Sequence, residues 1–113
     1  MNTDKTAICG FKLTNGLDLI AKIGGEDDKT IHLEDAFFLQ VQTQQNGDLN
    51  VEYVPLTVLG RPTGKSHMGF DVNLPVNSVL FQFELNPGIV DKYLSYVEPP
   101  SPLILPNKEL ITP

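Results

Sequence analysis

The sequence has little cysteine, little basic charge and no long apolar run, and each shortage excludes a class of protein. Its single cysteine, Cys9, cannot form a disulfide within the chain, which argues against a disulfide-stapled secreted domain. Residues 1–10 contain no basic stretch followed by an apolar one, so we expect no secretory leader. No apolar run approaches the roughly 20 residues that span a bilayer. We therefore expect a cytoplasmic protein with no membrane contact.

The charge of the chain is strongly unbalanced. Its 8 lysines and arginines are outnumbered by 14 aspartates and glutamates, which gives a net charge of −6. Such a field repels a polyanion over the surface as a whole, although a local basic loop could still bind one. The 113 residues, 41% of them hydrophobic, suit one globular domain. A domain of this size is only marginally stable alone, so association that buries more surface would stabilise it.

Apolar residues alternate with polar ones, or run continuously, in short stretches separated by glycine, asparagine and proline. Asn15-Gly16 favours the positive-φ turn of a two-residue hairpin, residues 24–29 form a second turn, and Asn46-Gly47 marks a third. The stretch 30–43 is alternating at first and then continuously apolar, which is typical of a strongly bent sheet or a small barrel. Residues 59–69 are predicted to be a loop. The predicted strands cover residues 8–13, 17–23, 30–43, 49–53, 70–74 and 79–85.

One helix is predicted near the C-terminus, over residues 87–97. Asn86 is a suitable N-cap, and Pro87 suits the first helical position. An apolar stripe should pack one face of this helix on the sheet; it consists of Ile89, Tyr93 and Val97.

The remaining residues, 98–113, are rich in proline and are expected to form an extended tail. The tail contains the apolar triplet Leu103-Ile104-Leu105. We expect this triplet to dock in a groove, either on the same subunit or on the next one.

Two stretches resemble the first motif of Sm and Sm-like proteins. Leu13-Thr14-Asn15-Gly16 looks like the strand end and Asn-Gly turn of that motif, and Leu33-Glu34-Asp35-Ala36 like its Leu-acidic-acidic-Ala end. Ala21 stands where the family usually has glycine, and Asp27 where it has the loop aspartate. The later part, through the helix, resembles uncharacterised Sm-like proteins carried by tailed phages of marine cyanobacteria. A phage-encoded protein would act in the host cytoplasm.

The resemblance implies a fold and an assembly. The fold is mostly β: a small, strongly bent, five-stranded antiparallel Sm-like (SH3-like) barrel that forms one domain over residues 1–97, with the helix at its end. In such barrels the fourth strand of one subunit pairs with the fifth strand of the next until a ring closes. We therefore expect a homo-oligomeric ring of about five to seven copies. Phe81 and Phe83, which alternate on the last predicted strand, are the candidate subunit interface.

The residues that grip uracil-rich RNA in this family are not matched. The pocket asparagine falls at Thr30 or Ile31, depending on the end from which the motif is counted, and the stacking ring falls at Asp28 or Lys29. The Arg-Gly pair of the second motif is absent from residues 79–83. The resemblance thus implies the fold without the usual pocket, and RNA binding would need other contacts.

The one basic cluster lies in the predicted loop. No acidic residue occurs between Val54 and Phe70, whereas three basic ones do. Around a ring, this loop would present a crown of positive charge that could contact phosphate or an acidic partner. Alternatively, it is a solvated loop with no ligand. The candidate nucleic-acid or anion contacts are Lys29, Thr30, Arg61, Lys65 and His67.

No residue set predicts catalysis, a cofactor or a metal. Ser66-His67 and Asp71 are the residue types of a hydrolase triad, but no strained Gly-x-Ser-x-Gly turn surrounds the serine. Glu26-Asp27-Asp28 are consecutive, whereas oxygen ligands of a cation must converge. The two histidines and Cys9 show no zinc spacing. We expect a non-enzymatic, ring-forming binding module with RNA as the ligand that the family implies. The alternative is a protein-interaction or assembly scaffold with no nucleic-acid role.

Overall fold

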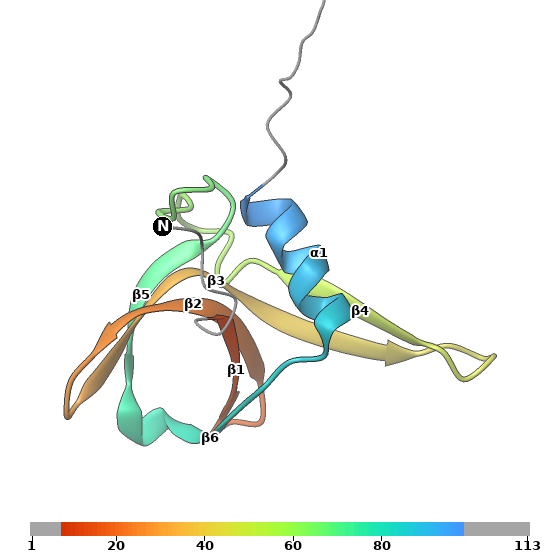
Figure 1. The fold of residues 1–113 in the computed structure, drawn as a ribbon, viewed down its shortest axis with the longest axis horizontal. Helices are drawn as coiled ribbons and strands as arrows, with labels where there is room; N and C mark the ends of the chain where they lie inside the picture. Colours follow the sequence, from red (N-terminus) through yellow and green to blue (C-terminus); the bar gives the residue numbers. More distant parts are fainter. Residues whose placement is uncertain (1–7, 99–113) are drawn as a thin grey trace, which may run out of the picture.

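The computed structural model describes residues 8–98, which form a mostly β fold with one helix at its C-terminal end (Figure 1). The fold class predicted at this level is confirmed. The elements are β1 (Ile8–Leu13), β2 (Asp18–Glu26), β3 (Thr30–Thr43), β4 (Leu49–Val54), β5 (Phe70–Pro75), the 3₁₀ helix η2 (Val76–Ser78), β6 (Val79–Phe83) and the α-helix α1 (Pro87–Val97).

The strands form one antiparallel, strongly curved sheet (Figure 1). Its order is β4-β3-β2-β1-β6, and β5 pairs with β3 off this path. The first half of β3, from Thr30 to Ala36, pairs with β5, and the second half, from Phe38 to Thr43, pairs with β4. Within residues 8–98 no pairing joins β5 to β6, so the sheet is not closed. The five strands that the resemblance implies are not what the structure has: six are present, and they correspond to the six stretches predicted from the apolar pattern.

Both Asn-Gly sequences lie in hairpin loops of three residues, not two. In the β1–β2 loop, the Gly16 amide donates to the Leu13 carbonyl (2.9 Å) and the Leu13 amide donates to the Leu17 carbonyl (2.9 Å). Gly16 and Gly47 alone carry the positive φ of these loops, 88° and 89°. This geometry is a type I turn followed by one left-handed residue. Asn15 instead accepts a hydrogen bond from the Leu17 amide through Oδ1 (3.0 Å).

Three predicted boundaries differ in the structure. Strand β2 extends to Glu26, so the glycines of the predicted turn lie in the strand and the turn is confined to residues 27–29. Strand β6 ends at Phe83, and Leu85 beyond it is buried in contact with the helix cluster. The loop before β5 begins at Pro55.

The first of two apolar cores lies inside the curve of the sheet. Strands β1, β2 and β3 supply its buried side chains, and Val72 and Leu74 of β5 and Val79 of β6 pack against it. Burial of these side chains holds the two ends of the curved sheet together where no hydrogen bonds do. The buried members are Phe11, Leu13, Leu19, Ala21, Ile31, Leu33 and Ala36.

The second core lies between the outer face of the sheet and α1. Ile20 and Phe37 are partners in register on β2 and β3, and both belong to this cluster. Leu19 and Ala36, which precede them in sequence, point into the first core. Because α1 covers the outer face here, β2 and β3 are buried on both faces, which explains their continuous apolar runs.

Helix α1 agrees with the prediction in its bounds and in its apolar stripe, since Tyr93 and Val97 are buried. Asn86 occupies the N-cap position, but its side chain makes no capping hydrogen bond, so the predicted cap is wrong in that respect. Beyond the last turn, Glu98 forms an ion pair with Lys22 of β2. This pair ties the end of the helix to the sheet.

The predicted tail and its apolar triplet lie outside the described residues, apart from Glu98. Among residues 8–98, no helix combines the length and the apolar character needed to cross a membrane.

Candidate functional site

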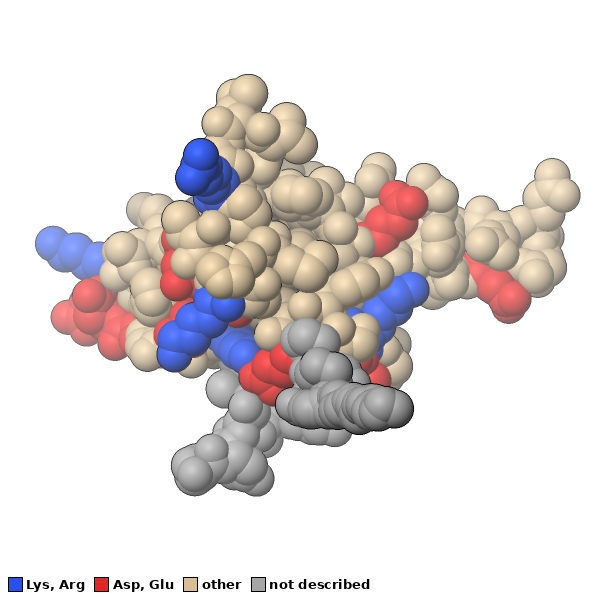
Figure 2. Space-filling model, turned by 90° about the horizontal axis from the view of Figure 1, so that it is seen from above, with Lys and Arg blue, Asp and Glu red and all other residues tan. Residues whose placement is uncertain are grey.

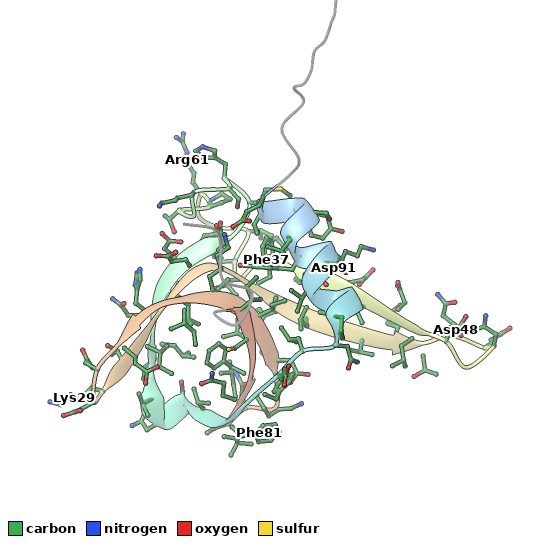
Figure 3. The ribbon with its side chains drawn as sticks, viewed as in Figure 1. Lys29, Phe37, Asp48, Arg61, Phe81 and Asp91 are labelled. Carbon is green, nitrogen blue, oxygen red and sulfur yellow. The ribbon has the colours of Figure 1, made fainter. Side chains whose placement is uncertain are left out.

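The candidate ligand-contacting segment is the loop of residues 55–69 between β4 and β5, named here the basic loop. It projects at the upper side of Figure 1, and Figure 3 shows Arg61 at its outer part. Arg61, Lys65 and His67 are all exposed, so the structure brings three of the predicted contacts onto one loop. Beside them, Val58 and Leu59 are 88% and 94% exposed. No sequence pattern marks this apolar pair as part of a site.

A buried carboxylate holds the base of the basic loop. Asp35 of β3 is only 3% exposed and has a φ of 51°. The Ser66 hydroxyl donates to Asp35 Oδ1 at 2.5 Å, and the Ser66 amide approaches the same atom at 3.4 Å. The Ser66 oxygen in turn accepts from the Met68 amide (3.0 Å). Because hydrogen bonds to an ionised group are stronger than neutral ones, this contact fixes the position of the loop.

Two glycines allow the loop to approach Asp35. A Cβ atom at Gly64 would lie 1.9 Å from Asp35 Oδ1, and one at Gly69 would lie 2.6 Å from the Asp35 carbonyl carbon. The Gly64 amide also donates to the Gly69 carbonyl (2.9 Å), which closes the loop on itself. No sequence pattern predicts this anchor, and the glycines on either side of Ser66 are its only signal in the sequence.

Asp71 and Tyr93 complete the anchor from β5 and α1. Asp71 Oδ1 accepts from the Asp35 amide (3.1 Å), while the Asp71 amide donates to Thr63 Oγ1 (2.9 Å). The Tyr93 hydroxyl donates to the Asp35 carbonyl (2.8 Å). Burial, and then the nearby Asp35 charge, raise the pKa of Tyr93, so its hydroxyl remains a donor at neutral pH.

The hydrogen bonds of Ser66 lead to Asp35 and not to His67. Within the described part of the chain no hydrogen bond joins the Ser66 hydroxyl to the His67 ring, and His67 lies exposed with a φ of 63°. A serine nucleophile needs a base that takes its proton, with a third group to orient that base. Nor do residues 8–98 contain a group of three or more His, Cys, Asp or Glu that could hold a metal ion.

Lys29 and Thr30 lie in a different place, at the turn between β2 and β3. Asp27 Oδ1 accepts from the Lys29 amide (2.8 Å) and the Thr30 amide (2.9 Å). These bonds hold the pKa of the Asp27 carboxyl below its usual value. Figure 3 shows Lys29 at the tip of the β2–β3 turn, at the lower left, and Arg61 at the top of the molecule. The structure therefore does not join Lys29 and Thr30 to the basic loop.

Charges of both signs are interspersed on the face seen in Figure 2. Lysine and arginine side chains lie among aspartates and glutamates, with large uncharged areas between them. One copy of the chain therefore presents no continuous basic field on this face. A polyanion site would depend on several copies of the basic loop acting together.

The predicted interface residues lie on β6, at one end of the sheet. Phe81 is 53% exposed and its neighbour Leu80 is 61% exposed. Phe83 is partly buried against the second core. The Phe81 and Phe83 rings are in contact, with centroids 5.9 Å apart and planes at 59°. Strand β6 thus carries an exposed apolar surface.

A groove lies where the start of α1 passes β6. Its volume is about 590 Å³, which is within the range of ligand pockets. Two exposed acidic residues, Glu84 and Asp91, contribute to it. The rest of the lining is largely apolar and includes Ile8, Phe83, Leu85, Pro87 and Val90.

The chain matches no protein-family model and, at a significant level, no curated protein sequence. Its own surfaces are therefore the guide to its function.

Proposed function

We propose that the chain is a non-enzymatic, Sm-like binding module whose copies associate through the edges of their sheets into a ring. The observation that carries the proposal is the edge strand β6. It pairs with β1 on one side only and exposes Leu80 and Phe81. Solitary edge strands are usually protected by charge, proline or a bulge. The sequence of β6, Val-Leu-Phe-Gln-Phe, contains neither charge nor proline, and its one irregularity is a shift of register against β1 at Leu80.

The complementary edge is β4, at the other end of the sheet order. It pairs with β3 on one side only, and Leu49 at its start is exposed. Pairing of β6 in one copy with β4 in the next is a head-to-tail contact, and such contacts close into rings when the rotation permits. By resemblance to Sm-like barrels, the ring contains about five to seven copies.

The ligand contact is the basic loop. Cyclic symmetry places every copy of this loop on the same face of the ring. Arg61, Lys65 and His67 from each copy then form a crown of positive charge on an otherwise acidic protein, and single-stranded RNA is the ligand that this crown suits. The anchor on Asp35 supports the proposal because it holds each loop in one position.

Multi-angle light scattering tests the ring. At micromolar concentration we expect the wild-type chain to have a mass of several subunits. Phe81→Lys should be monomeric, since a lysine on an exposed edge strand opposes pairing. Leu59→Lys is the matched control, because Leu59 is also exposed but lies on the basic loop, and it should leave the mass unchanged. A monomeric wild-type chain would refute the ring.

Fluorescence polarisation with uracil-rich and adenine-rich RNA tests the ligand. We expect binding that weakens steeply between low and moderate salt, because each phosphate contact releases counterions. The double variant Arg61→Glu/Lys65→Glu should abolish binding, whereas Lys29→Glu, on the separate turn between β2 and β3, should retain most of it. Absence of binding at low salt would exclude RNA.

The second candidate function is a protein-interaction scaffold, and the exposed pair Val58 and Leu59 favours it. An exposed apolar pair beside a basic residue suits a protein partner better than a phosphate backbone. Such a contact would be insensitive to salt and would be lost in Val58→Ser/Leu59→Ser. RNA binding by the basic loop should depend on Arg61 and Lys65 instead.

A further inference from the structure

The apolar groove between β6 and α1 has no occupant among residues 8–98, although the chain itself contains a segment that fits it. We infer that the segment around Leu103, Ile104 and Leu105 folds back into this groove on its own chain. The inference concerns a surface separate from the basic loop and does not depend on ring formation.

The chemistry of the segment matches the lining of the groove. In an extended chain, Leu103 and Leu105 point to the same side and Ile104 to the other. Two leucines on one side suit the apolar surface that Phe83, Leu85 and Val90 provide. Prolines at positions 102 and 106 bracket the triplet, and they favour the extended backbone that a groove can accept.

One basic residue of the segment can meet the acidic residues of the groove, and Glu109 follows it directly. Glu84 and Asp91 contribute negative charge to the groove. Lys108 follows the triplet by three residues and is the single basic residue after Glu98. The other end of the chain is a poor competitor, because residues 1–7 read Met-Asn-Thr-Asp-Lys-Thr-Ala and contain no apolar run.

The chain is long enough for the segment to reach the groove of its own subunit. From Val90, in the groove, to Val97, at the end of α1, the helix rises about 10 Å. The six residues from Val97 to Leu103 can span up to about 20 Å when extended. A short connection also gives the segment an effective concentration in the millimolar range at its own groove, which favours it over the segment of a neighbour.

Tryptophan fluorescence of the full chain tests the inference, since the natural sequence contains no tryptophan. Leu105→Trp places the probe in the docking segment, and Leu110→Trp is the matched control beyond it. We expect the emission of Leu105→Trp to be shifted to shorter wavelength and to be quenched less by acrylamide than that of Leu110→Trp. Equal emission and equal quenching in the two variants would overturn the inference.

A charge swap tests the complementarity in the Leu105→Trp background. Glu84→Lys and Lys108→Glu should each lower the ratio of docked to free segment by a factor of about two to five, the size of an exposed ion pair. The two changes together should restore the emission. Glu84 is exposed, so its replacement should leave the fold intact by circular dichroism. Failure of the double variant to recover would contradict the proposed pairing.

Mixed assemblies identify the chain that supplies the segment. Leu105→Trp chains are refolded with an excess of Glu84→Lys chains that carry no tryptophan. If each segment occupies its own groove, the emission stays at the docked wavelength. A shift to longer wavelength would show that the segment enters a neighbour's groove and would overturn the same-chain assignment. Light scattering on these variants should report an unchanged subunit number, so failure of the ring and failure of docking are distinguishable.

Discussion

At the scale of single residues, Asp35 has the most consequential environment. It is the one buried charged side chain among residues 8–98. Burial of a charge is costly unless hydrogen bonds compensate. Ser66 supplies such a hydrogen bond from the basic loop. The position of the basic loop therefore depends on Asp35 of β3. The shape of a surface loop here depends on a carboxylate in the core.

Ser66→Ala should destabilise the fold by about 1–3 kcal/mol, the cost of leaving a buried, charged acceptor without its donor. Chemical unfolding monitored by circular dichroism would measure this. Ser95→Ala is the control: Ser95 is exposed on α1 and donates only to the Lys92 carbonyl, so its change should stay within about 0.5 kcal/mol. Equal losses in the two variants would contradict the anchoring role of Ser66.

Gly64→Ala and Gly88→Ala should have opposite effects on the free energy of unfolding. A Cβ at Gly64 would lie 1.9 Å from Asp35 Oδ1, whereas a Cβ at Gly88 meets nothing within 4 Å. The first change must displace the loop or Asp35, at a cost of about 1–3 kcal/mol. The second should stabilise α1 by about 0.5–1 kcal/mol, because alanine loses less backbone entropy in a helix. Denaturant titration of both variants checks the pair.

At the scale of elements, the docking of α1 on β4 depends on aromatic side chains. The Tyr53 hydroxyl of β4 donates to the Ile89 carbonyl of the first helical turn (2.7 Å). Its ring makes edge contacts with Phe37 and Tyr96, at centroid distances of 6.4 and 5.2 Å. Burial raises the pKa of Tyr53 to about 12. The helix thus depends on Tyr53 remaining protonated.

This dependence predicts a loss of stability in alkali. The pKa of Tyr53 is about 12 in the folded state, above the ordinary value of 10.0. The contribution of the protonated Tyr53 side chain to the free energy of unfolding is therefore complete below pH 10, and it is lost as the pH rises toward 12. Tyr53→Phe should lower stability by about 0.5–1.5 kcal/mol at pH 8, through the lost hydrogen bond. It should also lose less stability than the wild type between pH 10 and 11 in urea titrations. If the wild type and Tyr53→Phe lose the same stability between pH 10 and 11, ionisation of Tyr53 does not weaken the packing of α1 on the sheet.

At the scale of the whole molecule, the open sheet is the main feature. Within residues 8–98, β4, β5 and β6 each pair with one strand only, and the curvature brings no second partner strand to β4 or β6. A small domain gains stability when such edges are buried by association. The proposed ring therefore implies that folding and assembly are coupled.

Coupling of this kind makes the melting temperature depend on protein concentration. We expect the melting temperature of the wild type and of Leu59→Lys to rise across a hundredfold increase in concentration. That of Phe81→Lys should stay constant, because its β6 edge no longer pairs. Added salt should not weaken the assembly, since backbone hydrogen bonds and apolar contacts are little screened. Calorimetry at several concentrations checks both expectations.

Part of the functional surface could be predicted from the sequence. The basic residues of the loop occur in a stretch without acidic residues, a local property, and Arg61, Lys65 and His67 are all exposed on that loop in the structure. Lys29 and Thr30 are candidate contacts only through the resemblance to a family motif, and the fold places them on the separate turn between β2 and β3. The pairing of Ser66 with Asp35 joins residues 31 positions apart. No local pattern connects two such residues.

The sequence by itself determined the type and approximate extent of the main elements. Residues 30–43 and 87–97 form the predicted strand and helix because apolar periodicity and proline placement act over a few residues. Only the tertiary structure decided which strands pair, why the sheet stays open and how the basic loop is anchored. These features depend on contacts between distant segments, such as β5 with β3 and α1 with the outer face of the sheet. The apolar pattern of each strand or helix is compatible with several tertiary arrangements. Burial of the apolar side chains in the two cores favours one of them.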